Sequence, residues 1–392
     1  NSFLQINGGT AINAGAVSVD SFVMMDGTWS QVAPTLPGFA ARDFNLWGGT
    51  FIRAKGGDGS TLTPYQIADV YGLQGVDSVG MAGKHYKLAN NIDASGTAAW
   101  NYGWGFTPIG TVAGSFTGTF DGMGHAISGL SIDRPGTDLV GLFRATSGSA
   151  AIRNLALVGG SVKGHNQVGA LVGYNQASIT GSYASTDVTG NLYVGGLVGF
   201  SNNGSISDSH ADGVVNGVGS VGGLVGYSLS SSISHSYATG NVIGRDYVGG
   251  LIGQNGRYST TGSNVSDSYA TGNVTGRQEL GGLVGGHLSD TITNSYATGS
   301  VSGIGFAIGG LVGELSYATV SNSYHGTGNV TGSSDTGGLV GANYSGVVTN
   351  SFWDKQTSGQ ASSAGSASSA GKTSAEMMQA ATFTGWDMAS AG

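Results

Sequence analysis

The sequence of 392 residues has no cysteine, five prolines and only 9% charged residues. Without cysteine there are no disulfide bonds or thiolate metal sites, and only histidine and carboxylate ligands remain. No run of about 18 apolar residues occurs, so a membrane-spanning helix and membrane insertion are not expected. The net charge is −8 and the 14 lysines and arginines form no basic run, so nucleic acid is not an expected partner.

The most abundant feature is glycine, with 74 residues. Collagen is excluded because glycine does not recur at every third position. Since 39% of the residues are apolar, the chain can bury a core and disorder throughout is not expected. The chain begins at Asn1 without a methionine or a signal-like segment, and we interpret it as a processed or excised piece.

A phrase close to Gly-Gly-Leu-Val-Gly recurs through the middle of the chain. Its leucines are 26, 27, 27, 32, 28 and 28 residues apart: Leu171, Leu197, Leu224, Leu251, Leu283, Leu311 and Leu339. A second phrase, Ser-Tyr-Ala-Thr-Gly, follows at the same period, with Tyr183, His210, Tyr237, Tyr269, Tyr296, Tyr324 and Phe352 at its aromatic position. Repetition at this period predicts one solenoid array of about seven units over residues 138–352. The longest unit has extra residues near Arg257 to Gly262, which we assign to a loop.

Side chains within each unit alternate with a period of two. Ala238, Gly240 and Val242 are predicted to share one face. Thr239 and Asn241 then share the opposite, outward face. Each unit is expected to hold two or three short strands with tight corners, and stacked units pair in parallel about 4.8 Å apart. The predicted fold class is all-β, a right-handed parallel β-helix with two short accessory helices, with the handedness taken from the general crossover rule.

Stacking places equivalent residues above one another along the rod. The repeated leucines and the Val or Ile that follow them are predicted to form columns inside the core. Glycine beside them is expected to allow corners at positive φ and close approach between coils.

The sequence predicts three segments. Residues 1–137 are expected to form irregular N-terminal coils with a short helix near 64–74, for which Thr63 fits the N-cap and Pro64 the first position. Residues 138–352 form the repeat solenoid. Residues 353–392 are a Ser/Gly/Ala-rich flexible segment and a short helical cap that opens at Thr373 with a capping box. Phe383 and Trp386 are expected to hold this helix over the end of the rod.

The Gly-Gly-Leu-Val-Gly units resemble the GLUG repeat, named for its Gly-Leu-any-Gly core. The run from Tyr86 to Ile127 and the ending Ser351-Phe352-Trp353-Asp354 are similar to segments that commonly flank such repeats. The resemblance implies a stretch of a large secreted bacterial surface protein, including adhesins of the filamentous-haemagglutinin type exported by two-partner secretion. GLUG repeats also occur beside peptidase domains, but neither His-Glu-x-x-His nor a Gly-x-Ser-x-Gly between a strand and a helix is found here.

No catalytic residue, metal site or cofactor is predicted. The seven histidines fall in different columns and no pair has a ligand spacing. Asp93, Asp121, Asp133 and Asp138 could in principle supply an acid–base pair, while the carboxylates within the repeats suit turns. The aromatic column is expected to stack as part of the wall rather than to bind sugars.

One surface has a functional hypothesis: an uncharged strip of hydroxyl and amide side chains that faces outward at a regular spacing. It consists of Thr239, Asn241, Thr271, Asn273, Thr275, Thr298, Ser300, Ser302, Thr327, Asn329 and Thr331. A flat lattice of this kind suits a ligand or lateral contact with another rod, although small polar residues also simply solvate a β-wall.

The favoured interpretation is a non-enzymatic structural or adhesive segment of a secreted bacterial surface protein or extracellular fibre, as in a biofilm. Two alternatives remain open. One is a glycan- or ice-binding module that uses the strip, and the other is a polysaccharide-cleaving β-helix enzyme that uses Asp93 or Asp121. Expected partners are a second copy, end to end or laterally, and host or matrix glycans.

Overall fold

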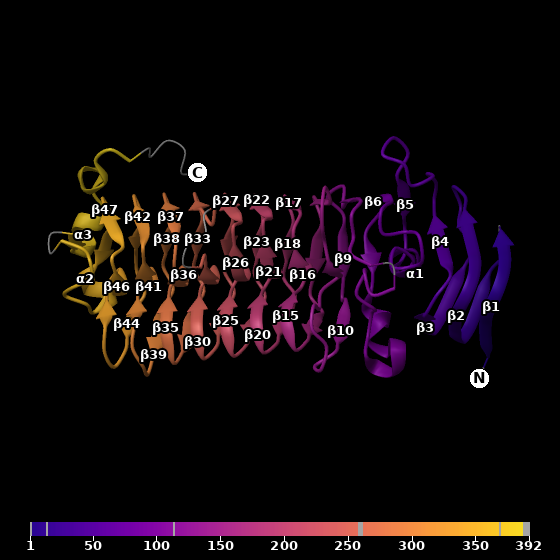
Figure 1. The fold of residues 1–392 in the computed structure, drawn as a ribbon, viewed down its shortest axis with the longest axis horizontal. Coiled ribbons are helices and arrows are strands. Elements are labelled where there is room, and N and C mark those ends of the chain that lie inside the picture. Colours follow the sequence, from indigo (N-terminus) through magenta and orange to yellow (C-terminus); the bar gives the residue numbers. More distant parts are fainter. Residues whose placement is uncertain (1, 13–14, 113, 258–261, 368–369, 387–392) are drawn as a thin grey trace.

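The computed structural model describes residues 2–12, 15–112, 114–257, 262–367 and 370–386. The chain winds into an elongated rod that runs from long N-terminal strands at one end to short helices at the other (Figure 1). Pairings between its named strands are parallel, as in β21 (Val198–Asn202) with β26 (Val225–Leu229). The predicted parallel β-helix is therefore confirmed.

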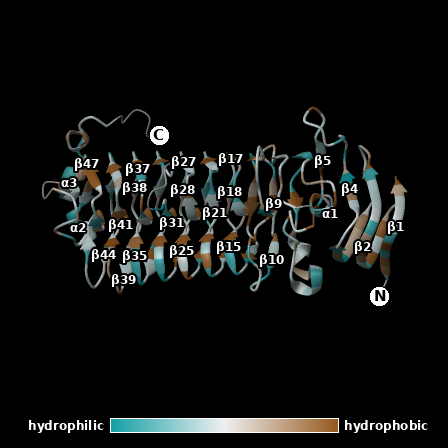
Figure 2. Cartoon of the chain, viewed as in Figure 1, coloured by the Kyte–Doolittle hydropathy of each residue, from teal (hydrophilic) through white to brown (hydrophobic). Residues whose placement is uncertain are grey.

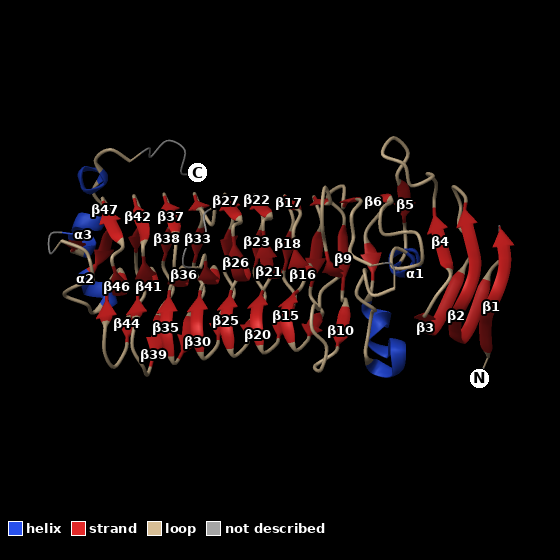
Figure 3. Cartoon of the chain, viewed as in Figure 1, coloured by secondary structure: helices blue, strands red, loops and turns tan. Residues whose placement is uncertain are grey.

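Each coil of the array holds five short strands rather than the two or three predicted, because the corners interrupt the extended backbone more often than the alternation suggests (Figure 3). The five strands belong to five sheets, which we number in chain order around the coil. Sheet 1 comprises β5 (Tyr65–Ile67), β6 (His85–Leu88), β8 (Thr119–Asp121), β12 (Ala151–Arg153), β17 (Ser178–Thr180), β22 (Ser205–Ser207), β27 (Ser232–Ser234), β32 (Val265–Ser266), β37 (Asp290–Thr293), β42 (Ala318–Ser321) and β47 (Val347–Thr349). Sheet 2 comprises β7 (Ile92–Asp93), β9 (Ala126–Ser128), β13 (Ala156–Val158), β18 (Tyr183–Ala184), β23 (His210–Ala211), β28 (Tyr237–Ala238), β33 (Tyr269–Ala270), β38 (Tyr296–Ala297), β43 (Tyr324–His325), β48 (Phe352–Asp354) and β49 (Gly371–Lys372).

The other three sheets lie within the array and its lead-in. Sheet 3 comprises β10 (Ser131–Asp133), β14 (Ser161–Lys163), β19 (Asp187–Thr189), β24 (Val215–Asn216), β29 (Val242–Ile243), β34 (Val274–Gly276), β39 (Val301–Gly303) and β44 (Val330–Thr331). Sheet 4 comprises β15 (Asn166–Gly169), β20 (Leu192–Gly195), β25 (Gly219–Gly222), β30 (Asp246–Gly249), β35 (Gln278–Gly281), β40 (Ile308–Gly309) and β45 (Thr336–Gly337). Sheet 5 comprises β11 (Phe143–Ala145), β16 (Val172–Asn175), β21, β26, β31 (Ile252–Asn255), β36 (Val284–His287), β41 (Val312–Ser316) and β46 (Val340–Tyr344).

The N-terminal coils have a different form. They consist of longer strands in one sheet: β1 (Phe3–Ile12), β2 (Val17–Val32), β3 (Phe39–Leu46) and β4 (Thr50–Ala54). β2 pairs with β1 on one side and with both β3 and β4 on the other. Two register shifts interrupt the β1–β2 pairing.

The helices are short. They are α1 (Val70–Gly75), α2 (Lys355–Ser358), α3 (Ser374–Met377) and the 3-10 segments η1 (Ser95–Gly103) and η3 (Ala380–Phe383). α1 begins six residues later than predicted, because Asp69 and not Thr63 caps it. The Thr63 hydroxyl instead donates to Asp58 in the preceding turn. The capping box of Thr373 and Glu376 is confirmed at α3, while α2 was not predicted.

The core of the array is a set of aliphatic columns, and hydrophobic residues recur from coil to coil along the rod (Figure 2). The repeated leucines and their Val or Ile neighbours are fully buried, as predicted. Each such side chain contributes about 1.5–3 kcal/mol by burial. The stability of a repeat protein is the sum of such contributions from its successive coils.

The glycines of the repeated phrase let the backbones of neighbouring coils approach closely, and they do not have positive φ angles. A Cβ on Gly253 would lie 2.4 Å from the backbone nitrogen of Val221 in the preceding coil. Most positive φ angles in the array belong to residues that are not glycine, among them Tyr193 at 58° and Glu279 at 55° in sheet 4. The prediction of positive φ is therefore wrong for the glycines beside the repeated leucines.

The C-terminal end of the rod is covered by the segment after β48. Gln360 donates to the Val330 carbonyl at the end of sheet 3, and the Ala364 amide donates to the Val340 carbonyl at the end of sheet 5. The Gly338 amide, directly after the last strand of sheet 4, donates to the Ser362 carbonyl. This Ser/Gly/Ala-rich segment, predicted to be flexible, is thus bonded across the last coil; its residues 368–369 lie outside the described residues.

Candidate functional surfaces

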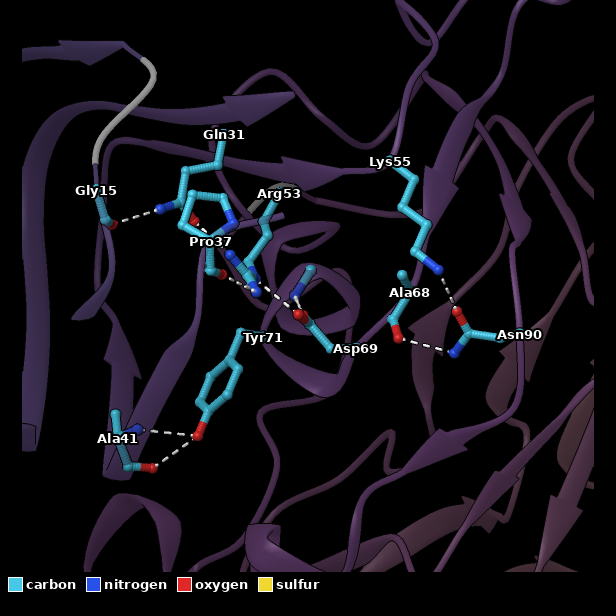
Figure 4. Close-up of polar contacts among 11 residues, drawn as sticks. Gly15, Gln31, Pro37, Ala41, Arg53, Lys55, Ala68, Asp69, Tyr71 and Asn90 are labelled. Carbon is cyan, nitrogen blue, oxygen red and sulfur yellow. Dashed lines mark hydrogen bonds and ion pairs between the residues drawn. The ribbon is translucent and has the colours of Figure 1, made fainter. Parts of the chain in front are cut away.

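A hollow of about 560 Å³ lies beside α1, where the N-terminal coils meet the lead-in. Its lining includes Asp69, Tyr71 and Asp93. Figure 4 shows that much of the polar chemistry here is internal: Asp69 accepts from the Gly72 amide and pairs with Arg53 at 2.7 Å. The Tyr71 hydroxyl bonds both backbone groups of Ala41. These side chains hold α1 on the long strands.

The Arg53 guanidinium is the centre of this network and only 5% of it is exposed. Beyond its ion pair with Asp69, it donates to the Gln31 side chain at 2.6 Å and to the Pro37 carbonyl at 2.9 Å. A buried charge that is satisfied on several sides stabilises one arrangement of the residues around it.

Asp93 and Asp121, the two carboxylates of the enzyme alternative, lie in different sheets. Asp93 lies in sheet 2 at the hollow and accepts from the Ser95 amide, and hydrogen bonds from Ser95 lower its pKa. Asp121 lies in sheet 1, does not line the hollow, and forms a 2.7 Å ion pair with Arg153. The net result of burial and its hydrogen bonds, chiefly from Arg153, is a lowered Asp121 pKa. Both are therefore poor proton donors near neutral pH.

The histidines occupy different columns, as the sequence predicts. His287 is fully buried in sheet 5 beside Asn255, and burial lowers its pKa to about 4. His325 is buried in sheet 2 in register with Ala297, while His210 stacks in the aromatic column. Among the residues that the structure describes, no three His, Asp or Glu side chains gather as metal ligands.

The predicted Thr/Asn strip faces outward, but it is not flat. Thr239 and Asn241 lie between β28 and β29, so the strip bends over the corner from sheet 2 to sheet 3. Thr275 lies in β34, in register with Ser302 of the next coil. Most of the strip is exposed, with Thr298 and Ser300 partly buried.

Several side chains of the strip bond from coil to coil along the rod. The Asn241 side-chain oxygen accepts from the Asn273 amide, and that of Asn273 accepts from the Ser300 amide, each at 3.0 Å. The Ser300 hydroxyl accepts from the Asn329 amide at 3.3 Å. The middle of the strip is therefore a ladder that satisfies backbone donors at a corner.

The aromatic column is a stacked ladder, as predicted. Tyr237 and Tyr269 have centroids 4.8 Å apart and planes 2° apart, and the same stacking continues to Tyr296 and Tyr324. Burial raises the pKa of Tyr324 to about 12. Phe383 and Trp386 pack against Tyr324 on this side of the rod, rather than over its end as predicted. Because the rings face one another, their edges rather than their faces are presented outward.

Beside each aromatic residue lies a buried serine that the sequence reasoning missed. The Ser268 hydroxyl accepts from the Ser236 amide of the preceding coil and donates to the Ser266 carbonyl at 2.7 Å. Equivalent bonds join Ser182, Ser209, Ser236, Ser268, Ser295, Ser323 and Ser351. The sequence contains a signal for this serine column, because a serine directly precedes the aromatic position in every repeat.

A further set of contacts joins the positive-φ residues of sheet 4 to sheet 5 of the next coil. Tyr193 stacks on Tyr227 at 5.3 Å, and the Ser220 hydroxyl donates to Gln254. Two coils further along the rod, the equivalent positions are held by Glu279 in sheet 4 and Glu314 in sheet 5.

Both carboxyls are largely buried, with 6% and 8% exposed, and one Glu279 oxygen has no hydrogen-bond partner. Burial, with Glu314 nearby, raises the pKa of Glu279 to about 7.

The fold and its columns define a parallel β-helix built from repeats. The GLUG motif matches residues 164–189, 190–216, 217–243, 244–275 and 276–302. Each match covers one coil, beginning at sheet 4 and ending at sheet 3. The 32-residue match has its extra residues between β31 and β32, where residues 258–261 lie outside the described part.

Halomucin from Haloquadratum walsbyi is 40% identical over 162 residues, which cover 38% of this chain and 2% of halomucin. A protein of Evansella cellulosilytica, provisionally named a Gly-rich membrane protein, is 37% identical over 122 residues, covering 30% of this chain and 14% of that protein. The chain thus spans a small part of these relatives.

A solved structure from Bacteroides ovatus, provisionally described as an immunoglobulin A1 protease, has a TM-score of 0.45 and 20% identity, covering 76% of this chain and 86% of that one. None of the helices in the described residues has the length and apolar character needed to cross a membrane.

Proposed function

We propose that this chain is a rigid, non-enzymatic segment of a longer secreted or cell-surface protein, which acts as a stalk that sets distance and carries adhesive parts outward. The observation that supports this most is that polar and aromatic side chains on its walls bond or stack along the rod axis. The Asn241–Asn273 bond and the Tyr237–Tyr269 stack both join neighbouring coils. The similarity to two far longer proteins, halomucin and a Gly-rich membrane protein, also favours this role.

Such a rod is modular, because each coil contacts mainly its neighbours. Deletion of residues 217–243, one complete motif, should leave the remaining columns in register and shorten the rod by about 4.8 Å. Small-angle scattering would measure the length, with the deletion of residues 217–229 as a control that breaks the register. For function, variants with fewer or added motifs would be placed between a cell-surface anchor and a fluorescent protein. If the height of the fluorescent protein above the cell surface rises with the number of motifs, the stalk role is supported. A height that does not depend on the number of motifs contradicts it.

The Thr/Asn strip supports a second candidate function, the binding of glycans or lateral contact with another rod. It is uncharged, and Thr271 and Thr275 are exposed without belonging to the asparagine ladder. Replacement of both by valine should abolish glycan binding on an array if the strip is a binding surface. Unchanged binding, or no binding by the unaltered chain, would rule out glycan binding by the strip.

A further inference from the structure

Four tyrosines of successive coils stack without interruption in sheet 2. We call them the column tyrosines: Tyr237, Tyr269, Tyr296 and Tyr324. Parallel strands hold them in register. His210 precedes the run in this column and Phe352 follows it. Within the run, each phenol therefore has a second phenol beside it.

The rings of the column tyrosines meet face to face. Neighbouring centroids lie 4.8–5.0 Å apart and neighbouring planes differ by 2–7°. Because the coils of a solenoid repeat along its axis, equivalent carbons of neighbouring rings are separated by about the same distance as the centroids. All four side chains are partly exposed, so a small oxidant in solution can reach the ring edges.

Face-to-face contact is the arrangement in which two phenoxyl radicals couple. A phenol that loses one electron and its proton carries part of the unpaired spin on Cε1 and Cε2, the two ring carbons beside the C–O carbon. The orbital that holds this spin is perpendicular to the ring, so the new carbon–carbon bond starts between ring faces. Aligned atoms react at a separation of about 3–3.5 Å, and tilting of the partly exposed side chains closes the remaining distance.

The surroundings keep these phenols protonated until they are oxidised. Burial raises the pKa of Tyr237, Tyr269 and Tyr296. At neutral pH each ring therefore gives up its proton to water when it gives up its electron to the oxidant. The chain has no cysteine, so no thiol competes for the oxidant and no disulfide already joins the coils.

We propose that the column tyrosines are an oxidative cross-linking site, at which tyrosines of neighbouring coils become joined by a Cε–Cε bond. The oxidant belongs to the one-electron class, such as a peroxidase supplied with hydrogen peroxide. Two oxidising equivalents accept two electrons, two protons pass to water, and the two radicals form the bond. The hydrogen on each bonded carbon then moves to the oxygen of its own ring, which restores both phenols. The linkage does not depend on the proposed stalk role.

Photo-oxidation of the whole chain with tris(bipyridine)ruthenium(II) and persulfate, at low protein concentration, tests this site. Trypsin separates residues 164–245, 258–277 and 278–355, which contain Tyr237, Tyr269 and Tyr296 respectively. Mass spectrometry should find a monomer that is lighter by two hydrogen atoms. After digestion, Tyr269 should be joined to Tyr237 or to Tyr296.

Two double variants locate the reaction. Tyr269→Phe/Tyr296→Phe leaves no neighbouring pair among the column tyrosines, and phenylalanine already occupies this column at Phe352. The dityrosine fluorescence of the monomer should fall about tenfold, because the oriented partner is lost. Tyr102→Phe/Tyr344→Phe is the matched control: it also removes two tyrosines, which are 85% and 53% exposed and lie outside the column, and the fluorescence should persist.

Circular dichroism would show that each variant is folded. Cross-links found only between chains, cross-links confined to the other stacked pair of Tyr193 and Tyr227, or equal fluorescence of the two double variants would overturn the proposal. An unaltered chain that forms no dityrosine would also overturn it.

Discussion

The N-terminal coils and the repeat array use the same parallel pairing but stabilise it differently. In the N-terminal coils, long strands enclose an aromatic cluster in which Phe44 contacts Phe22, Phe51 and Trp100 with centroids 5.1–5.2 Å apart. In the array, the core is aliphatic, and the aromatic residues form a ladder on the outside. One region depends on contacts that occur once, and the other on contacts repeated in each coil.

This difference decides how far the effect of a substitution spreads. An array shares its stability among similar neighbouring coils, so one lost contact is a small fraction of the total. The aromatic cluster has no second copy, and losing one ring removes several contacts together. The following experiments test this contrast, from the largest expected effect to the smallest.

Phe44→Ala should cost about 3–5 kcal/mol, because the side chain is fully buried and touches several rings. Hydrogen exchange should show loss of protection in β2, β3 and β4 while residues 164–302 stay protected. Leu251→Ala is the comparison within the array, where a smaller loss centred on its own coil is expected. Equal loss of protection along the whole rod after Phe44→Ala would show that the two regions unfold as one unit.

Gly253→Ala should destabilise the array by about 3 kcal/mol, because the new Cβ meets rigid backbone of the preceding coil. Gly136→Ala is the control, since a Cβ there meets nothing within 4 Å and φ is not positive. Chemical denaturation measures both. Equal stability of the two variants would refute the close-approach role of the repeat glycines.

Glu279→Gln should stabilise the array at high pH and not at low pH. The pKa of Glu279 is raised from 4.5 to about 7, so the folded chain holds a proton that the unfolded chain releases, and stability falls as pH rises through this window. Removal of the charge should recover up to about 3 kcal/mol at pH 8.5 and almost none at pH 4. Denaturation at the two pH values would measure it, and a gain that does not depend on pH would contradict the cause.

Ser268→Ala should cost about 1–2 kcal/mol, because it leaves the buried Ser236 amide without its acceptor. Ser232→Ala is the matched control, since Ser232 is exposed in the neighbouring sheet 1 strand β27. A melting curve for each variant would show the difference. A Ser268→Ala protein as stable as the control would mean that the serine ladder contributes nothing.

The array was predictable because stacking turns sequence repetition directly into columns. The leucine core, the tyrosine ladder and the capping box at Thr373 all follow from spacing alone. The five strands per coil did not follow, because a period of two continues unbroken through a corner such as Thr239 to Asn241.

The sequence also did not reveal contacts between a residue of one sheet and a residue of the adjacent sheet in the next coil. Glu279 and Glu314 are 35 positions apart, and only the tight turn between sheets 4 and 5 brings residues of this spacing together. At α1, the prediction named Thr63 alone as the cap, but the Thr63 hydroxyl donates to Asp58 in a turn and Asp69 caps the helix.

The most direct test of the stacked-coil account uses the absence of native cysteine. Thr275 and Ser302 are in register on neighbouring coils, so Thr275→Cys with Ser302→Cys should place two thiols on strands about 4.8 Å apart and form a disulfide on mild oxidation. Thr275→Cys with Thr331→Cys spans two coils, about 9.6 Å, beyond the reach of a disulfide. The account predicts rapid cross-linking within the folded first variant and none in the second. Equal cross-linking of the two variants, or none in the first, would contradict it.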